Sequence, residues 1–341
     1  MMLKLFAEKC PIQNPDEVHL FPLLKKVNQV RDALIDYYCF DDNIEFCDYL
    51  IIPISIEYLM SNNQINYVKF IISKGNEFNK KILLFSTGDF GTSIQEKNVI
   101  TIRLGGFKSA QYGQTFIMSP FIEDPYNKLN FKFETLDKQN KPSIGFVGHS
   151  NAGLDKLFKE FLIFLKGTFF RIIKKELTDF QKFYPSSYFR AKYLILIQKN
   201  QQINCNFIFR KKYRAGAVSL ENRKKTNNEF FENISQNLYT FCMRGSGNFS
   251  VRFYETLVMG RIPVLLNTDC SLPFYETINW SEHCLVIEES EVKNISKKLI
   301  DFHNDHDNEL LKKIQIKNRA LWLNYFQKDD FFIQLYKDLK K

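Results

Sequence analysis

The chain has 341 residues, which fits two domains of about 150 residues each, and its 45% hydrophobic and 25% charged residues exclude a disordered or fibrous protein. Residues 1–140 hold 15 basic against 17 acidic residues, whereas the remainder holds 32 against 21, so the positive charge belongs to the second half. We expect neither a membrane span nor a signal peptide, and the seven scattered cysteines without a Cys-x-x-Cys pair indicate reduced thiols in a cytosol.

The first half alternates short apolar runs with helix-like stretches. We predict strands at residues 3–7, 47–56, 81–86 and 99–104, and helices at 23–38 and 65–78. This alternation indicates a parallel sheet covered by helices. A polar stretch at 123–142 marks a linker, so we place an N-terminal Rossmann-like domain at residues 1–135.

The second half begins with another strand and helix. A strand from Ser143 runs into a glycine-rich turn that ends at Gly153, and a helix follows at 154–169. Further strands are predicted at 193–197, 206–209, 238–243, 262–266 and 284–287, with helices from 291 onward. We therefore expect a second domain at 142–308 and C-terminal helices at 309–341 that pack back on the first domain.

A glycine turn between an apolar strand and a helix is the most informative local feature. The strand at 238–243 leads into Gly245-Ser-Gly247, and the helix predicted at 248–259 has Ser250 in its first turn and ends at Gly260. Free N–H groups and the dipole at a helix N-terminus favour anions, and glycines let a phosphate approach closely. The turn therefore predicts a phosphate site.

Charged side chains flank this turn. Arg244 and Arg252 can fork onto phosphate oxygens. Glu255 lies three residues after Arg252, on nearly the same helical face, where its carboxylate can accept both hydroxyls of a ribose. Together these groups predict a nucleotide site, although an exposed Arg252–Glu255 ion pair with no ligand is the alternative.

Residues 241–274 closely resemble the exostosin-like glycosyltransferase family. The resemblance rests on the order Arg-Gly, Ser-x-Arg-Phe-x-Glu, Gly-x-Ile-Pro-Val and Leu-Pro-Phe, which is far more specific than a lone glycine-rich loop. Weaker similarity extends to Phe146-Val-Gly148 and to the basic stretch 210–216, and the first 140 residues are similar only in outline.

The resemblance implies an α/β protein of GT-B architecture, with two Rossmann-like domains facing across a cleft. It further implies inverting transfer, without metal or cofactor, from a nucleotide-diphosphate donor such as a UDP-sugar to a glycan or glycolipid acceptor in cell-surface polysaccharide synthesis. By this resemblance Arg252 neutralises the donor pyrophosphate, Glu255 holds the ribose, and Arg244, Gly245 and Ser250 line the phosphate turn. The second domain holds the donor and the first domain mainly the acceptor.

An inverting transfer needs a base that takes the proton of the acceptor hydroxyl. Asp89 follows an apolar strand and lies in a glycine-flanked loop, where α/β sheets expose functional groups, so it is the first candidate. Glu57, after the strand at 47–56, is the second. Either carboxylate could instead cap a helix or shape a turn.

Three further features allow two interpretations each. His149 could contact the donor phosphate or could be a surface-loop histidine without a role. The cluster His303-Asn-Asp-His-Asp307 could bind a metal, but a solvated polar turn is favoured. The basic run 210–214 could bind phosphate or anionic lipid, or could be a solvated face.

Two other functional classes are alternatives to a glycosyltransferase. A non-catalytic sugar- or nucleotide-binding module is one, and the full set of charged residues around the glycine turn argues against it. Nucleic-acid binding would use the positive second half, yet no helix-turn-helix, zinc-finger or RNA-recognition signature is present. We expect a cytoplasmic protein that does not bind nucleic acid and could contact an anionic membrane peripherally.

Overall fold

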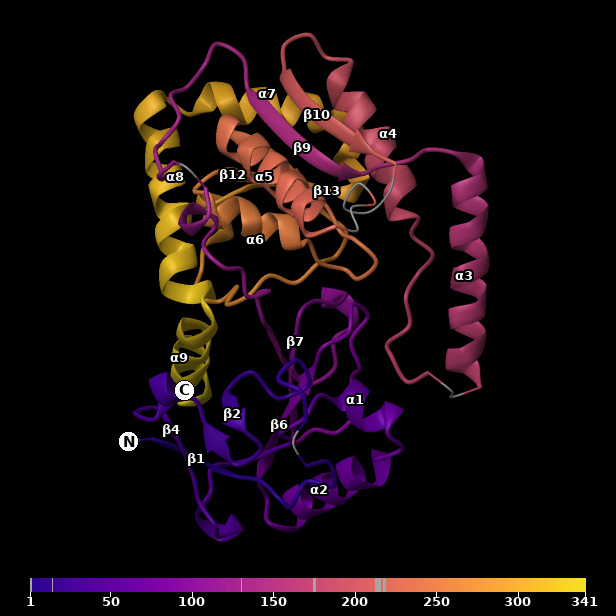
Figure 1. Ribbon diagram of the computed structural model, residues 1–341, viewed down its shortest axis with the longest axis vertical. Coiled ribbons are helices and arrows are strands. Elements are labelled where there is room, and N and C mark those ends of the chain that lie inside the picture. Colours follow the sequence, from indigo (N-terminus) through magenta and orange to yellow (C-terminus); the bar gives the residue numbers. More distant parts are fainter. Residues whose placement is uncertain (1, 14, 130, 174–175, 212–215, 217–218) are drawn as a thin grey trace.

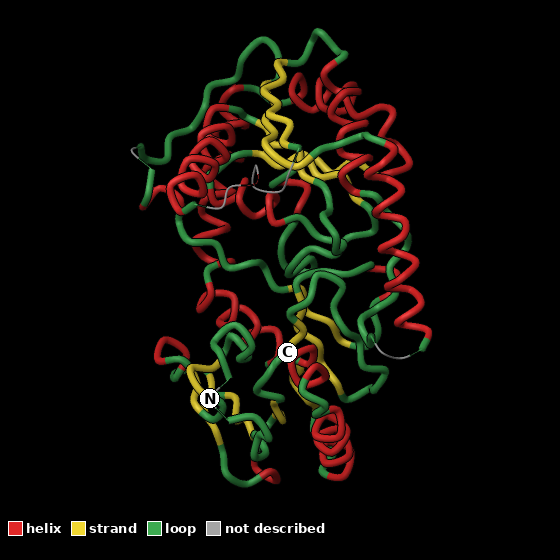
Figure 2. The backbone as a smooth tube through the Cα atoms, turned by 45° about the vertical axis from the view of Figure 1, so that its right-hand side comes forward, coloured by secondary structure: helices red, strands yellow, loops and turns green. Residues whose placement is uncertain are grey.

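Two α/β domains follow one another along the chain, the first at the bottom and the second at the top of Figure 1. The computed structural model describes residues 2–13, 15–129, 131–173, 176–211, 216 and 219–341. Each domain contains its own parallel sheet, and the two groups of strands lie apart in Figure 2. The prediction of an α/β protein with two Rossmann-like domains, the GT-B arrangement, is confirmed.

The sheet of the first domain has the order β4-β1-β5-β6-β7-β8, and every pairing in it is parallel. Its strands are β1 (Leu3–Phe6), β4 (Tyr38–Phe40), β5 (Tyr49–Ile51), β6 (Lys81–Ser86), β7 (Val99–Arg103) and β8 (Gln114–Ile117). Along β6, Leu83 and Phe85 enter one apolar core while Ile82 and Leu84 enter the other. A sheet buried on both faces explains the uninterrupted apolar runs in the sequence.

Helices from opposite ends of the chain cover this sheet. They are α1 (Ile56–Ser61) and α2 (Ile65–Glu77) on one face and the C-terminal α9 (Lys328–Leu339) on the other. The Tyr38 hydroxyl donates to the carbonyl of Phe332 at 2.7 Å, and the Tyr49 hydroxyl donates to that of Leu339 at 2.9 Å. The last helix of the chain is therefore part of the first domain's core.

The sheet of the second domain has the order β10-β9-β11-β12-β13, again with parallel pairings. Its strands are β9 (Ser143–His149), β10 (Asn204–Arg210), β11 (Tyr239–Cys242), β12 (Ile262–Asn267) and β13 (Leu285–Glu288). In order of sequence this is 2-1-3-4-5, so the direction of winding reverses between β9 and β11. Ligands of such sheets bind outside the carboxyl ends of the strands at this switch point.

The second sheet also has helices on both faces. They are α4 (Ser186–Gln198), α7 (Ile295–Asp305) and α8 (Asn308–Leu321) on one face, and α5 (Leu220–Gln236) and α6 (Val251–Val258) on the other. The core beneath α6 continues into the first domain through Trp322 and Phe326, which bound the π-helical turn between α8 and α9. One apolar core thus joins the two domains.

One long helix stands apart from both layers. This is α3 (Leu154–Ile172), at the right edge of Figure 1, and none of its residues is buried. Within the described residues, no helix combines the length and apolar character needed to cross a membrane.

Two predicted elements are wrong. Residues 23–38 form a hairpin of β2 (Leu24–Lys26) and β3 (Gln29–Val30) and then a 3₁₀ turn, because Val27-Asn28 makes a two-residue turn and tertiary packing overrides the helical spacing. Residues 193–197 belong to α4, where Leu194 and Ile197 are buried while Ile195 is exposed, a helical and not a strand-like pattern. Short apolar runs do not distinguish the two structures by themselves.

Candidate functional site

The carboxyl ends of β9 and β11 lie side by side at the switch point of the second sheet. β9 ends at His149, and β11 is followed by Arg244 and the turn that leads to α6. The predicted helix start at 248 is three residues early, because Asn248 uses its side-chain amide to donate to the carbonyls of Gly106, Thr268 and Asp269. The turn is thereby fixed to both domains before the helix begins.

Arg190, on α4, ties these two strand ends together. Its guanidinium donates to the carbonyl oxygen of His149 at 2.8 Å and to that of Arg244 at 2.9 Å. Burial, followed by the nearby charge of Arg252, lowers the pKa of Arg190 to about 10. The side chain therefore remains protonated at neutral pH and places a fixed positive charge at the switch point.

Arg244 is buried between two aromatic rings. Its guanidinium lies 5.1 Å from the ring centre of Phe107 in the first domain and 4.8 Å from that of Tyr184 in the second. It donates to the carbonyl of Ser246 at 2.9 Å and to the side-chain oxygen of Gln181 at 3.3 Å. The stacking holds the cation beside the turn with little freedom to move.

Arg252 reaches from α6 across to β9. It donates to the carbonyl of Val147 at 2.7 Å and lies 4.2 Å from the ring centre of Phe146. Gly148 makes this approach feasible, since a Cβ there would lie 2.7 Å from Nη2 of Arg252. The guanidinium of Arg252 is thus directed to the end of β9, as that of Arg190 is.

These three arginines form a cationic cluster. Each hydrogen bond given above for Arg190, Arg244 and Arg252 ends on an uncharged oxygen. The Nε of each has no hydrogen-bond partner among the described residues. A buried donor without a partner costs about 1–3 kcal/mol, and burial lowers the pKa of all three. An anion bound here would satisfy both the donors and the charge.

The other residues predicted for the donor lie around this cluster. Ser250 is buried and is the N-cap of α6, with no side-chain capping bond. A Cβ on Gly245 would meet no atom within 4 Å, so there is open space at the turn. Glu255 lies one turn along α6, where its charge counteracts the effect of burial on the pKa of Arg252.

His149 is half-buried at the end of β9. Burial, and then the charges of Lys156 and Arg190, lower its pKa below the ordinary 6.5. The imidazole is therefore neutral at pH 7 in this state, and a bound anion would raise its pKa again. The structure places it next to the arginine cluster without assigning it a ligand.

The first domain contributes the loop that follows β6. The carbonyl of Asp89 packs so closely on Gly247 that a Cβ there would lie 1.9 Å from it. The side chain of Asp89 is exposed, yet partial desolvation within its loop raises its pKa above 3.8. The first candidate base therefore lies beside the glycine turn.

Glu57 has a different environment. Its carboxylate accepts hydrogen bonds from the hydroxyl of Ser86 at 2.5 Å, the backbone N–H of Thr87 at 2.9 Å and the hydroxyl of Thr92 at 3.0 Å. These bonds hold both ends of the Asp89 loop. The second candidate base is thus engaged in shaping the loop that carries the first.

A buried ion pair also fixes this loop. Arg103, which is 2% exposed, donates to Asp179 at 2.6 Å and to the carbonyl of Phe90 at 2.7 Å. Asp179 belongs to the segment between α3 and α4 and also accepts from the N–H and the hydroxyl of Ser93, both at 2.8 Å. The second domain thereby holds the loop of the first.

The cluster at 303–307 has a structural explanation. His303 is fully buried between the Tyr239 hydroxyl at 3.0 Å and the Gln139 carbonyl at 2.7 Å, and Asp307 caps α8 by accepting from the N–H of Leu310. Over the part of the chain that the structure describes, no group of three or more metal-ligating side chains occurs. Of the basic run 210–214, residues 212–214 lie outside the described residues.

Three residues of the site escaped the sequence interpretation. They are Gln181, Tyr184 and Arg190, which come from the segment before α4 and from α4 itself. The prediction of a strand at 193–197 hid the helix that carries Arg190 to the two strand ends. Nothing in the local sequence distinguishes Gln181 or Tyr184.

Comparison with known proteins gives a family for part of the chain. Residues 188–301 match the Exostosin GT47 domain. Similar proteins include a probable glucuronoxylan glucuronosyltransferase of Arabidopsis thaliana, 35% identical over 66 residues, which are 19% of this chain and 14% of that protein. Exostosin-1 of Bos taurus is 34% identical over 89 residues, 26% of this chain and 11% of that protein. The matches thus cover only a small part of these relatives.

Solved structures give a weaker likeness. A glycosyltransferase from Rickettsia africae has 12% identity and a TM-score of 0.35, with 100% of this chain and 99% of that chain covered. A TarM mutant of S. aureus has 10% identity and a TM-score of 0.37, with 86% and 50% covered. Such scores carry no argument about the site. On the family match, the chain carries an exostosin-like glycosyltransferase domain over residues 188–301, as the motif at 241–274 predicted.

Proposed function

We propose that the protein transfers a sugar, with inversion and without metal, from a nucleotide-diphosphate donor to a glycan or glycolipid acceptor, and that it acts in the synthesis of a cell-surface polysaccharide. The observation that carries this proposal is the cluster of Arg190, Arg244 and Arg252 at the switch point, whose described hydrogen bonds end on uncharged oxygens. A diphosphate has the charge and the acceptor oxygens that this cluster lacks.

In the proposed donor complex the diphosphate lies at the glycine turn before α6. The open space at Gly245 and the free N–H groups at the start of α6 receive the phosphates, while Glu255 accepts the ribose hydroxyls. Charge accumulates on the leaving diphosphate as the glycosidic bond breaks. Preorganised guanidinium groups stabilise that charge in the transition state, which is the work that a metal ion would otherwise do.

Asp89 is the proposed base. The acceptor hydroxyl attacks the anomeric carbon from the face opposite the diphosphate, and Asp89 takes its proton. The contact of its backbone with Gly247 supports this role, because it brings this residue of the first domain to the glycine turn of the second. Glu57 then acts as a positioning residue for the loop.

Thermal-shift and calorimetric titration with UDP-, GDP- and CMP-sugars test the donor site, since a ligand of the folded state raises its melting temperature. UDP-glucuronic acid belongs in this panel, because several of the similar proteins are named glucuronosyltransferases. Arg190→Lys should weaken binding, since an ammonium cannot reproduce the forked donors, whereas the exposed Arg223→Lys should not. An unchanged melting temperature at millimolar nucleotide sugar would refute the donor site. Binding without donor hydrolysis or transfer would instead identify a non-catalytic binding module.

A further inference from the structure

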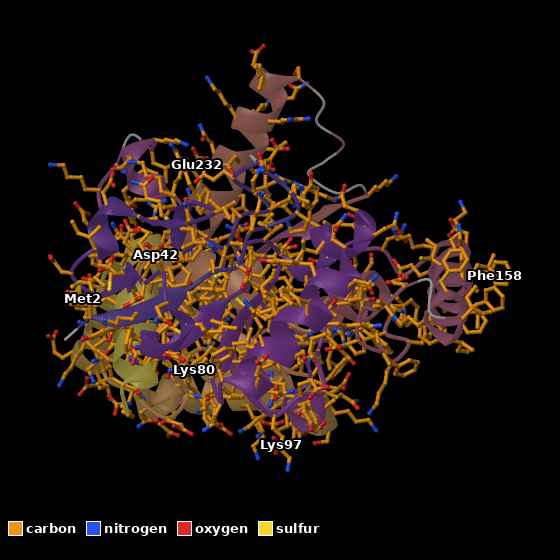
Figure 3. All side chains as sticks on the ribbon, turned by 90° about the horizontal axis from the view of Figure 1, so that it is seen from below. Met2, Asp42, Lys80, Lys97, Phe158 and Glu232 are labelled. Atoms are coloured by element: carbon orange, nitrogen blue, oxygen red, sulfur yellow. The ribbon has the colours of Figure 1, made fainter. Side chains whose placement is uncertain are left out.

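The helix α3 has an apolar stripe along its length. The stripe residues recur at steps of three and four and are Leu154, Phe158, Phe161, Leu162, Leu165, Phe169 and Ile172. All are exposed, from 39% for Phe161 to 76% for Leu154, and Phe158 projects away from the body of the protein in Figure 3. Contiguous exposed apolar surface of this kind marks an interaction site.

The inner side of α3 contacts the protein through apolar as well as polar side chains, since the rings of Phe161 and Phe164 lie 5.3 and 5.4 Å from the ring of Phe183. Lys156 pairs with Glu160 at 3.6 Å, and Arg171 pairs with Glu176 at 2.9 Å while lying 5.1 Å from the ring centre of Phe90 in the first domain. A surface helix of a globular protein turns its apolar side inward. Beyond these inner contacts the stripe is left exposed instead of being turned inward, so it fits an external apolar phase.

Charge indicates which phase this is. Lys159 and Lys166 are exposed and lie along one border of the stripe by helical spacing, where their ammonium groups can reach lipid headgroups. The chain carries a net charge of +9, which attracts an anionic surface and opposes the approach of a second copy. A helix with an exposed apolar face and a basic border can lie in the plane of a membrane interface.

We propose that α3 docks on an anionic lipid surface, with the stripe in the acyl boundary and Lys159 and Lys166 at the headgroups. The docked helix is joined to the site at both ends. It begins shortly after His149, and the segment that follows it supplies Gln181 and Tyr184 to Arg244. On the proposed transferase function, the acceptor is then a glycan carried by a lipid of that surface.

Vesicle co-sedimentation of the full chain tests the docking without any need for activity. The protein should bind vesicles that contain phosphatidylglycerol and bind phosphatidylcholine vesicles more weakly. Phe158→Ser with Phe169→Ser should weaken binding by about tenfold or more, since each ring removed from the acyl boundary loses a large apolar area. Val18→Ser with Phe46→Ser is the matched control, because these residues are 70% and 65% exposed in the first domain.

A second pair of variants tests the charge without changing the stripe. Lys159→Glu with Lys166→Glu should weaken binding to phosphatidylglycerol vesicles by about tenfold or more, whereas exposed Lys97→Glu with Lys132→Glu should change it little. The melting temperature of each variant checks that it folds, and the lysine pair remains informative where the serine pair does not fold.

Three outcomes overturn the proposal. They are no binding to vesicles, binding that the serine and lysine pairs leave unchanged, and a concentration-dependent dimer that the serine pair abolishes while vesicle binding is absent. In the last case a second copy covers the stripe. Donor hydrolysis measured without vesicles reports on the transferase function separately, so that either proposal can fail alone.

Discussion

The two sides of the contact between the domains treat buried charge in opposite ways. Arg103 of the first domain pairs with Asp179 of the second, and Glu57 of the first domain accepts hydrogen bonds from the loop after β6. In the second domain, Arg190, Arg244 and Arg252 donate to carbonyls and to one amide oxygen. Arg103 thus donates to a carboxylate, whereas the described hydrogen bonds of the three arginines end on uncharged oxygens, although the charge of Glu255 counteracts the effect of burial on the pKa of Arg252.

This difference separates structure from chemistry. A buried arginine that faces a carboxylate fixes a loop, and its environment is complete without a ligand. Burial and the charge of Arg252 lower the pKa of Arg190, and perturbed pKa values of this kind cluster at functional sites. On the proposed function, the contrast favours the second domain for the diphosphate, and Asp89 remains the candidate base of the first domain, with its backbone against the glycine turn.

The largest effect should come from Asp89→Asn. If Asp89 is the base, transfer should fall by about 10²- to 10⁴-fold, the usual contribution of a general base, while donor binding in calorimetry stays intact. Asp42→Asn, an exposed change in the same domain, is the control and should leave transfer unchanged. Near-normal transfer by Asp89→Asn would remove it from the mechanism.

The pH dependence of transfer gives an independent check on Asp89. A base must be ionised, so activity is lost as the pH falls through its pKa, and desolvation raises this pKa above 3.8. The acid limb of the rate profile should therefore lie above pH 3.8. The residual activity of Asp89→Asn should not show that limb.

The next effect should come from Glu255→Gln. Loss of the carboxylate charge from hydrogen bonds to ribose should weaken donor binding by about 1.5–3 kcal/mol, because one partner of those bonds is no longer ionised. Isothermal titration with the donor measures it, and Glu232→Gln on the exposed face of α5 is the control. Unchanged affinity would contradict the ribose assignment and with it the predicted role of α6.

The strand, glycine turn and helix at 239–258 could be predicted because their signals are local. An apolar strand, two glycines, a helix and the stop at Gly260 follow one another in the sequence, and Gly260 adopts a φ of 63° as a helix-ending glycine does. The role of Arg190 was not predictable, because it depends on α4 reaching two strand ends. For α3 the period of the sequence predicts an amphipathic helix, but not that its apolar side faces outward.

A smaller and purely structural effect should come from Asp179→Asn. The change removes the charge that pairs with the 2%-exposed Arg103 and should lower the free energy of unfolding by about 1.5 kcal/mol. Denaturant melts measure it. Donor affinity should be unaffected, because Asp179 belongs to the neutralised pair with Arg103. A loss of affinity larger than the loss of stability would contradict the contrast between this pair and the three arginines.

No change is expected from a metal chelator. Transfer should proceed in EDTA, because the proposed charge stabilisation comes from arginines and the start of α6. Initial rates with and without chelator measure it. A complete loss that an added divalent ion restores would contradict a metal-independent mechanism.

The pair of Arg103 and Asp179 has a mechanical consequence. The chain crosses between the domains twice, near Asp124 and again near Trp322, and residues of both crossings line one cavity of about 380 Å³. If the domains move apart, that side would serve as the hinge, and the Arg103–Asp179 ion pair would have to break or move with the first domain. Such an opening would also break the hydrogen bond from Asn248 to Gly106 and the stacking of Arg244 on Phe107. If α3 is held by lipid, each opening of the hinge moves the first domain relative to the membrane surface. Membrane attachment and substrate exchange then depend on the same domain motion.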